Sequence, residues 1–195
     1  MKVNNLNELF VHELKDLYDA EQQLVDALPK LAEAATNPDL SEAFRNHLVQ
    51  TREHVTRLEE VFRISGEEPD RVTCKAMKGL IDEGDRSRKL DTDDPSVLDA
   101  ALISAAQRVE HYEIAAYGTL KVWATTAGNE DAVSLLERTL EEEKLADEKL
   151  TEIAETGVNA EAESGEIEEP VTPSPRRSTT RPRASKPARS SRTRR

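Results

Sequence analysis

The chain has 195 residues, of which 34% are charged and only 4% aromatic, and it holds seven glycines. A β-sandwich or barrel normally uses more aromatic and β-branched residues and more turn glycines, so this composition argues against that class and favours long helices. The formal net charge of −12 averages two unlike parts, because residues 171–195 hold nine basic and no acidic residues and the first 170 residues therefore carry −21.

The single cysteine, Cys74, excludes an intramolecular disulfide and a zinc site built from several cysteines. The N-terminal residues contain no apolar run of signal-peptide length, and no segment approaches the roughly 20 apolar residues of a membrane span. We therefore expect a cytoplasmic protein with no membrane partner.

The first predicted helix spans residues 5–36. Asn5 suits the N-cap position, and Glu8 three residues later completes the pattern of a capping box. Pro29 lies inside this helix, where its missing N–H group should kink or locally break it.

The second predicted helix spans residues 38–66, because a proline suits the first helical position after Asn37 and Gly66 suits the end. A short helical stretch follows over residues 73–83, and Gly84 should end it. The third predicted helix spans residues 95–128 and opens in the same way as the second, with an aspartate before a proline.

The fourth predicted helix starts at once, with Asn129 as its cap, and ends near Gly157. Beyond that point an acidic stretch leads into PVTPSPRRSTTRPRASKPARSSRTRR, which cannot bury enough apolar surface to offset the entropy of ordering it. We therefore predict a folded domain over residues 1–156 and a disordered tail over residues 157–195, first acidic and then basic.

The lengths of the connections predict the fold. Almost nothing joins the first helix to the second or the third to the fourth, so each pair should form an antiparallel hairpin. About 28 residues separate the two hairpins. We expect an all-α protein, a ferritin-like four-helix bundle whose two hairpins are joined by a long crossover that contains a short fifth helix.

Acidic residues interrupt the apolar stripes of three of the four long helices. A turn of about 100° per residue places the apolar residues of each helix on one face, which should be buried in the bundle. His47 and His54 flank the stripe of the second helix. The acids on or at the edge of a stripe are Glu21 in the first helix, Glu110 and Glu113 in the third, and Glu143 and Asp147 in the fourth.

A buried, ionised carboxylate is very costly, so such groups pair, become protonated or bind a cation. Basic side chains are scarce on these stripes, with only Lys144 near the fourth. Two divalent ions held by the carboxylates and by an imidazole, for which His54 is a candidate, would balance the charge as in di-iron bundles. The alternative is that each acid lies at a stripe boundary, where a solvated arginine or a subunit interface satisfies it.

Four segments are distinctive together: LFVHELKDLYDAEQQL, CKAMKGLIDEG, AALISAAQRVEHYEIAAYGTL and LLERTLEEEKLADEKL. In this order and spacing they resemble the YciE/YciF family of bacterial ferritin-like stress proteins, over residues 4–156. The resemblance implies a ferritin-like bundle, a homodimer and a two-metal carboxylate site. Carried over by position, the implied metal ligands are Glu21, Glu110, Glu113, Glu143 and Asp147, with a contribution from the second helix.

The chain departs from the family pattern at two points. Relatives commonly read HLEET in the second helix, where this chain has Gln50 in place of a glutamate. The fourth helix offers Glu143 and Asp147 rather than a Glu-x-x-His motif. Either His54 serves as a ligand instead, or the site is asymmetric, weakly metallated or empty.

Two functions are compatible with these residues. The first is a stress-response protein with two iron or manganese ions that react with peroxide or dioxygen; the sequence leaves open whether it is an oxidoreductase of peroxidase type and assigns no catalytic residue. The second is a non-catalytic helical dimer whose basic residues 171–195 bind nucleic acid or another polyanionic partner through salt-dependent contacts.

Overall fold

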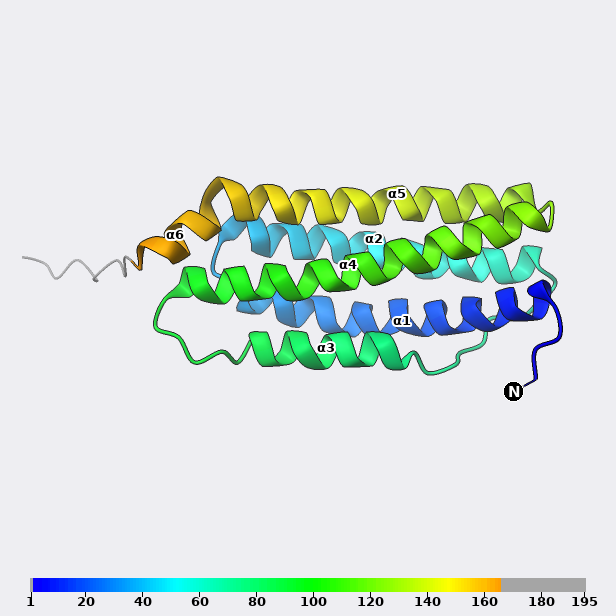
Figure 1. Ribbon diagram of the computed structural model, residues 1–195, viewed down its shortest axis with the longest axis horizontal. Helices are drawn as coiled ribbons and strands as arrows, with labels where there is room; N and C mark the ends of the chain where they lie inside the picture. The colour runs from blue at the N-terminus through cyan, green and yellow to red at the C-terminus, as the bar shows by residue number, and fades with distance from the viewer. Residues whose placement is uncertain (1, 166–195) are drawn as a thin grey trace, which may run out of the picture.

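The computed structural model describes residues 2–165, and the regular secondary structure in this range is helical throughout. Figure 1 shows four long helices lying side by side along the molecule. They are α1 (Leu6–Ala34), α2 (Pro38–Ile64), α4 (Pro95–Thr126) and α5 (Glu130–Ile153). The predicted bundle of two antiparallel hairpins is therefore confirmed, whereas the predicted disorder of residues 166–195 lies outside the described residues.

The long crossover between α2 and α4 contains the short helix α3 (Lys75–Ser87), as predicted. It packs on the outside of the bundle against α1 and α4 (Figure 1). Within the bundle, α2 packs against α5 and α1 packs against α4, in addition to the contacts inside each hairpin. The four long helices therefore surround one core.

The predicted N-caps are confirmed because each is a local feature of the sequence. The side chain of Asn5 accepts a hydrogen bond from the backbone N–H of Glu8 at 2.9 Å and donates one to the carboxylate of Glu8, also at 2.9 Å. Asn37, Asp94 and Asn129 cap α2, α4 and α5 through their side chains.

Two expectations about helix ends are wrong, and so is the possible break at Pro29. α1 continues through Pro29, which lies between the buried residues Leu28 and Ala32, while the predicted kink stays a prediction. α3 continues past Gly84 to Ser87, since a helical glycine costs only about 1 kcal/mol relative to alanine. The helical pattern also continues past Gly157.

The end of the bundle is formed by a π-helical turn, η1 (Ala154–Val158), followed by α6 (Asn159–Ser164). Ala154 and Val158 are buried, and Val158 is only 1% exposed. Their burial against the bundle, where η1 and α6 contact α4, carries the helical path beyond Gly157. Residues 157–164, which the prediction placed in the tail, are therefore helical, and the rest of the predicted tail lies outside the described residues.

The apolar core fills the space between the four helices from one end to the other. Its fully buried members include Leu14, Leu17, Leu58, Leu102 and Leu136. In the described part of the chain, no helix is both long and apolar enough to cross a membrane. What distinguishes this core is the acidic group at its centre.

Candidate metal centre

Each of the four long helices contributes at least one ionisable side chain to the centre of the bundle. Glu21 comes from α1, and His47 and His54 come from α2, seven residues apart on one face. α4 contributes two glutamates three residues apart and α5 contributes one. These six side chains, all 6% exposed or less, are Glu21, His47, His54, Glu110, Glu113 and Glu143.

The six side chains form two overlapping groups whose ligand atoms lie within 4.8 Å of one another. The first group contains His47, Glu110, Glu113 and Glu143, and the second contains Glu21, His54 and Glu143. Glu143 belongs to both. We call them the four-residue group and the three-residue group.

The distances show how closely the imidazoles approach the carboxylates. Nε2 of His47 lies 3.6 Å from Oε2 of Glu110 and 3.6 Å from Oε2 of Glu143. Nδ1 of His54 lies 2.9 Å from Oε1 of Glu143 and 3.5 Å from Oε1 of Glu21. Glu143 therefore faces both histidines and connects the two groups.

Most of the side-chain nitrogen and oxygen atoms of the two groups have no hydrogen-bond partner. Ten buried side-chain nitrogen and oxygen atoms in the described residues lack one, and eight of them belong to the two groups. Both carboxylate oxygens of Glu113 and both of Glu143 are among them. Because unpartnered buried polar atoms are rare and costly, their concentration at one point marks a group that could hold a cation.

Burial and mutual repulsion keep protons on this cluster. Burial raises the pKa of Glu143 to about 7 and that of Glu110 to about 8. Burial and the negative charge of Glu21 and Glu143 raise the pKa of Glu113 well above its usual range. The pKa of His54, although lowered by burial, is raised to about 10 by its contacts with Glu143 and Glu21.

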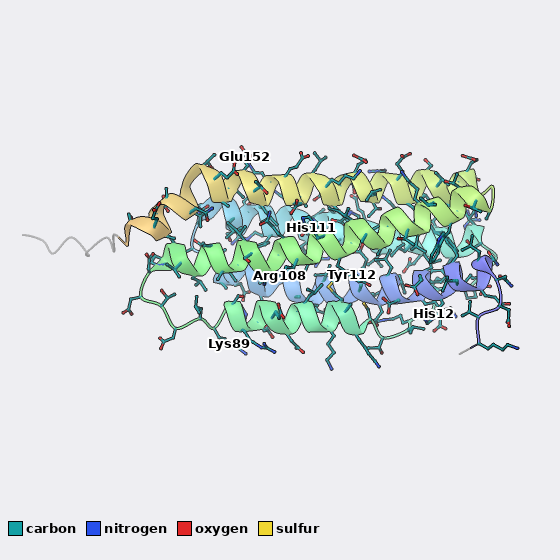
Figure 2. All side chains as sticks on the ribbon, viewed as in Figure 1. His12, Lys89, Arg108, His111, Tyr112 and Glu152 are labelled. Carbon is teal, nitrogen blue, oxygen red and sulfur yellow. The ribbon has the colours of Figure 1, made fainter. Side chains whose placement is uncertain are left out.

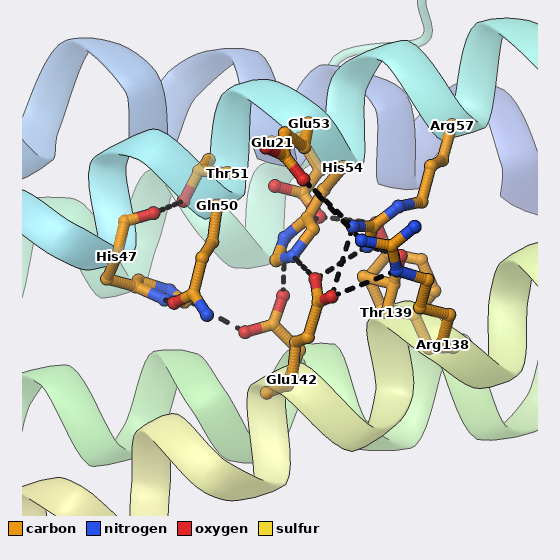
Figure 3. A network of polar contacts seen from close by, with 12 residues as sticks. Glu21, His47, Gln50, Thr51, Glu53, His54, Arg57, Arg138, Thr139 and Glu142 are labelled. Atoms are coloured by element: carbon orange, nitrogen blue, oxygen red, sulfur yellow. Dashed lines mark hydrogen bonds and ion pairs between the residues drawn. The ribbon is translucent and has the colours of Figure 1, made fainter.

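The orientation of His54 is fixed by a network on its other side, which Figure 3 shows. Nε2 of His54 lies 3.0 Å from Oε2 of Glu142, an oxygen that can only accept when ionised, so the ring carries a proton on Nε2. The guanidinium of Arg57 donates to both carboxylate oxygens of Glu142, at 2.6 Å and 3.1 Å. Nδ1 of His54 is therefore the atom left to bind a metal ion.

Two further contacts hold members of the groups in place. The hydroxyl of Tyr117, which is fully buried, donates to Oε1 of Glu21. Oε1 of Gln50 lies 3.4 Å from Nδ1 of His47. Gln50, at the position where relatives commonly have a glutamate, thus contacts a candidate ligand.

The donor set fits divalent transition metals. It offers four carboxylates and two imidazoles, and the carboxylates together balance the charge of two divalent ions once they lose their protons. Neither group contains a lysine or an arginine, so in the described residues the metal-free cluster is balanced by protons, including the proton that keeps His54 cationic. The buried histidine and glutamate groups could therefore hold metal ions.

The structure brings five of the six sequence-predicted ligands together: Glu21, His54, Glu110, Glu113 and Glu143. The sixth, Asp147, stands apart, one helical turn beyond Glu143. Its side chain is 21% exposed and contacts His111 at 3.4 Å and Gln107 at 3.2 Å. His111 itself lies on the outside of α4 (Figure 2).

His47 was not among the predicted ligands, although the sequence placed it beside the apolar stripe of α2. It is only 6% exposed, because α4 and α5 both approach this side of α2 through Glu110 and Glu143. The seven-residue spacing to His54 was the signal for it, since residues seven apart lie on the same helix face.

The bundle and its buried centre define a ferritin-like helical protein with a carboxylate–histidine group, and comparison with known proteins agrees. The chain belongs to the DUF892 family, described as a domain of unknown function, which matches residues 5–163. It is 46% identical over 165 residues to protein YciF of Escherichia coli (strain K12), an alignment that covers 84% of this chain and 99% of that protein.

Solved structures show the same fold. The crystal structure of the E. coli stress protein YciF matches with a TM-score of 0.77 and covers 80% of this chain and 99% of its own. YcfI from Rhodopseudomonas palustris, also 46% identical, matches with a TM-score of 0.74 over 77% of this chain and 95% of its own. A Xanthomonas campestris protein, 22% identical with a TM-score of 0.62 over 83% of this chain and 98% of its own, shares the fold.

Proposed function

We propose that this protein is a ferritin-like protein with a two-metal centre, holding iron or manganese, that serves the stress response. The observation that carries the proposal is the set of eight unpartnered buried atoms on six residues contributed by all four long helices. The similarity to a bacterial protein described as a stress protein supports the physiological part.

The residues have distinct parts in this proposal. The four-residue group would hold one ion and the three-residue group the other, with Glu143 shared between them. Two iron or manganese ions would supply a change between the divalent and trivalent states, and with it reactivity toward peroxide or dioxygen. Glu142 holds the Nε2 proton of His54 so that Nδ1 faces the centre.

Metal analysis of protein purified without chelators tests this proposal. The wild type should bind about two ions per chain, and Glu143→Ala should lose most of both because its side chain belongs to both groups. Glu21→Ala should lose mainly one ion. Glu148→Ala, an exposed glutamate on the same helix, is the matched control and should bind metal as the wild type does.

An absence of bound metal in the wild type, even after incubation with Fe²⁺ or Mn²⁺, would overturn the proposal. If metal binds, consumption of hydrogen peroxide by the loaded protein tests the proposed reactivity. The expected homodimer and the cytoplasmic location stay predictions.

The alternative function, binding of nucleic acid or another polyanion through residues 171–195, lies outside the described residues. The nine basic residues of this segment are the observation that favours it. Removal of residues 171–195 should abolish salt-dependent DNA binding, and an unchanged affinity after truncation would exclude it.

A further inference from the structure

An open cavity of about 390 Å³ lies beside the candidate metal centre, where α2 and α5 face each other. Its inner wall includes His47, Gln50 and Glu110, and its outer part includes the exposed residues Asp39 and Glu42. The remaining wall is largely apolar and comes from both helices. The cavity therefore leads from the surface of the bundle to its buried centre.

Two members of the four-residue group border this cavity. His47 is 6% exposed and Glu110 3% exposed, and Nε2 of His47 and Oε2 of Glu110 have no hydrogen-bond partner. Four further cavities in the described part of the chain have no member of either group in their walls. Glu142, which also belongs to the cavity wall, and its partner Arg57 cover His54.

The cavity wall is acidic. It contains four acidic side chains and one lysine, Lys149. Of the four acids, Glu142 is paired with Arg57. Asp39 and Glu42 stand at the mouth, where the charge of Lys149 acts on Asp39 and Arg45 lies 4.0 Å from Glu42. A cleft lined mainly by one sign of charge raises the local concentration of the opposite ion and repels ions of its own sign.

We propose that this cavity is the route by which a divalent metal ion reaches the centre, and that Asp39 and Glu42 attract the ion to its mouth. The inference rests on the proposed function, because it needs a centre that binds metal. It adds two residues that bind no metal in the loaded protein and that govern how fast metal arrives.

The first test alters the charge at the mouth. Metal-free protein is mixed with Mn²⁺ in a stopped-flow instrument, and free Mn²⁺ is followed with a fluorescent indicator. The double variant Asp39→Asn/Glu42→Gln should take up Mn²⁺ on the order of tenfold more slowly at low ionic strength, and this difference should shrink as salt is added. The double variant Glu67→Gln/Glu68→Gln removes the same charge from exposed positions beyond the far end of α2 and should match the wild type.

The second test blocks the cavity without a change of charge. Ala146→Trp places a large side chain in the wall and should slow Mn²⁺ uptake at every salt concentration. Ala115→Trp is the control. It makes the same change in the wall of a different cavity, which no candidate metal ligand borders, and it should leave the rate of Mn²⁺ uptake unchanged. The amount of Mn²⁺ bound at equilibrium should be equal in all of these proteins.

The outcomes separate this inference from the function on which it rests. If the wild type binds Mn²⁺ and both test variants take it up as fast as their controls, the access route is overturned and the metal centre stands. If the wild type binds no Mn²⁺, Fe²⁺ or other divalent ion at equilibrium, both are overturned. Slow uptake in the test variants alone, with unchanged stoichiometry, is the result we expect.

Discussion

Glu142 shows how a residue outside the ligand groups can decide how one of them binds. It lies 3.0 Å from Nε2 of His54 and is itself held by two hydrogen bonds from Arg57. A glutamine at this position could instead donate its N–H group to Nε2 of His54. The ring proton would then move to Nδ1, the atom that should bind metal. The carboxylate can only accept, so the proton stays on Nε2.

We therefore expect Glu142→Gln to weaken metal binding by about 10–100-fold, without removing a ligand. Competition with a chromophoric chelator measures the affinity directly. Glu141→Gln, which alters an exposed residue one position earlier on α5, should have no effect. Equal affinities for the two variants would show that the ring of His54 is positioned by packing alone.

The cluster also predicts how stability depends on pH when the metal is removed. In the folded, metal-free protein the pKa is raised to about 7 for Glu143, to about 8 for Glu110 and to about 10 for His54. A group with a raised folded-state pKa stabilises the fold fully below its unfolded-state pKa, and this contribution is lost as the pH rises through the folded-state value.

Urea unfolding of the metal-free protein should therefore show a free energy of unfolding that falls between about pH 5 and about pH 10. Metal binding competes with these protons, so the stabilisation by added metal should increase over the same range. Glu110→Gln removes one of the titrating groups and should flatten the profile of the metal-free protein. If the free energy of unfolding of the metal-free protein instead rose toward about pH 9, the carboxylates of the cluster would not be protonated in the folded state as inferred.

At the scale of the helices, one buried carboxylate joins the two hairpins. Asp99 on α4 is 2% exposed and accepts three hydrogen bonds from the connection between α1 and α2. The donors are the backbone N–H groups of Thr36 and Asn37, at 2.8 Å and 2.7 Å, and the hydroxyl of Thr36 at 2.6 Å. The contact fixes how one hairpin is set against the other.

Asp99→Ala leaves these partly buried donors without an acceptor and should lower the free energy of unfolding by about 2 kcal/mol. Denaturant unfolding measures the change. Asp93→Ala, at an exposed position in the loop before α4, is the control and should change stability little. A loss below about 1 kcal/mol for Asp99→Ala would mean that water replaces the missing acceptor.

The helices could be predicted from the sequence because the signals for their ends are local. The acids on their inward faces could be predicted as well. Asn5, Asn37 and Asn129 each cap a helix through a backbone group two or three residues away. Glu21, Glu113 and Glu143 could be placed in the core from the helical repeat alone, since 3.6 residues per turn fixes the face on which a residue lies.

What the sequence did not predict depends on how the helices approach one another. His47 lies at the edge of its stripe, and only the approach of α4 and α5 buries it. Asp147 lies on a stripe, but at its level of the bundle it faces Gln107 and His111 on the outer part of α4. The continuation past Gly157 likewise depends on the burial of Val158, a contact that no local pattern records.

At the scale of the whole molecule, the four long helices surround a point where buried glutamates and histidines replace apolar side chains. Each hairpin turns one face toward a cluster in which eight buried atoms lack hydrogen-bond partners, while the apolar core on both sides holds the bundle together. The fold is thus stable enough to keep a costly group of carboxylates in place, which is the arrangement that a preformed metal site requires.

The position of Glu143 in both groups makes the two halves of the centre depend on each other. If the centre binds metal as proposed, an ion in one half would displace the proton of this carboxylate and orient it, so that the other half would receive a ligand that is already charged. Loading should therefore be cooperative, with few chains that carry a single ion when metal is scarce. A protein of this kind would respond to the supply of metal as a switch, with an empty and a full state, rather than in proportion to it.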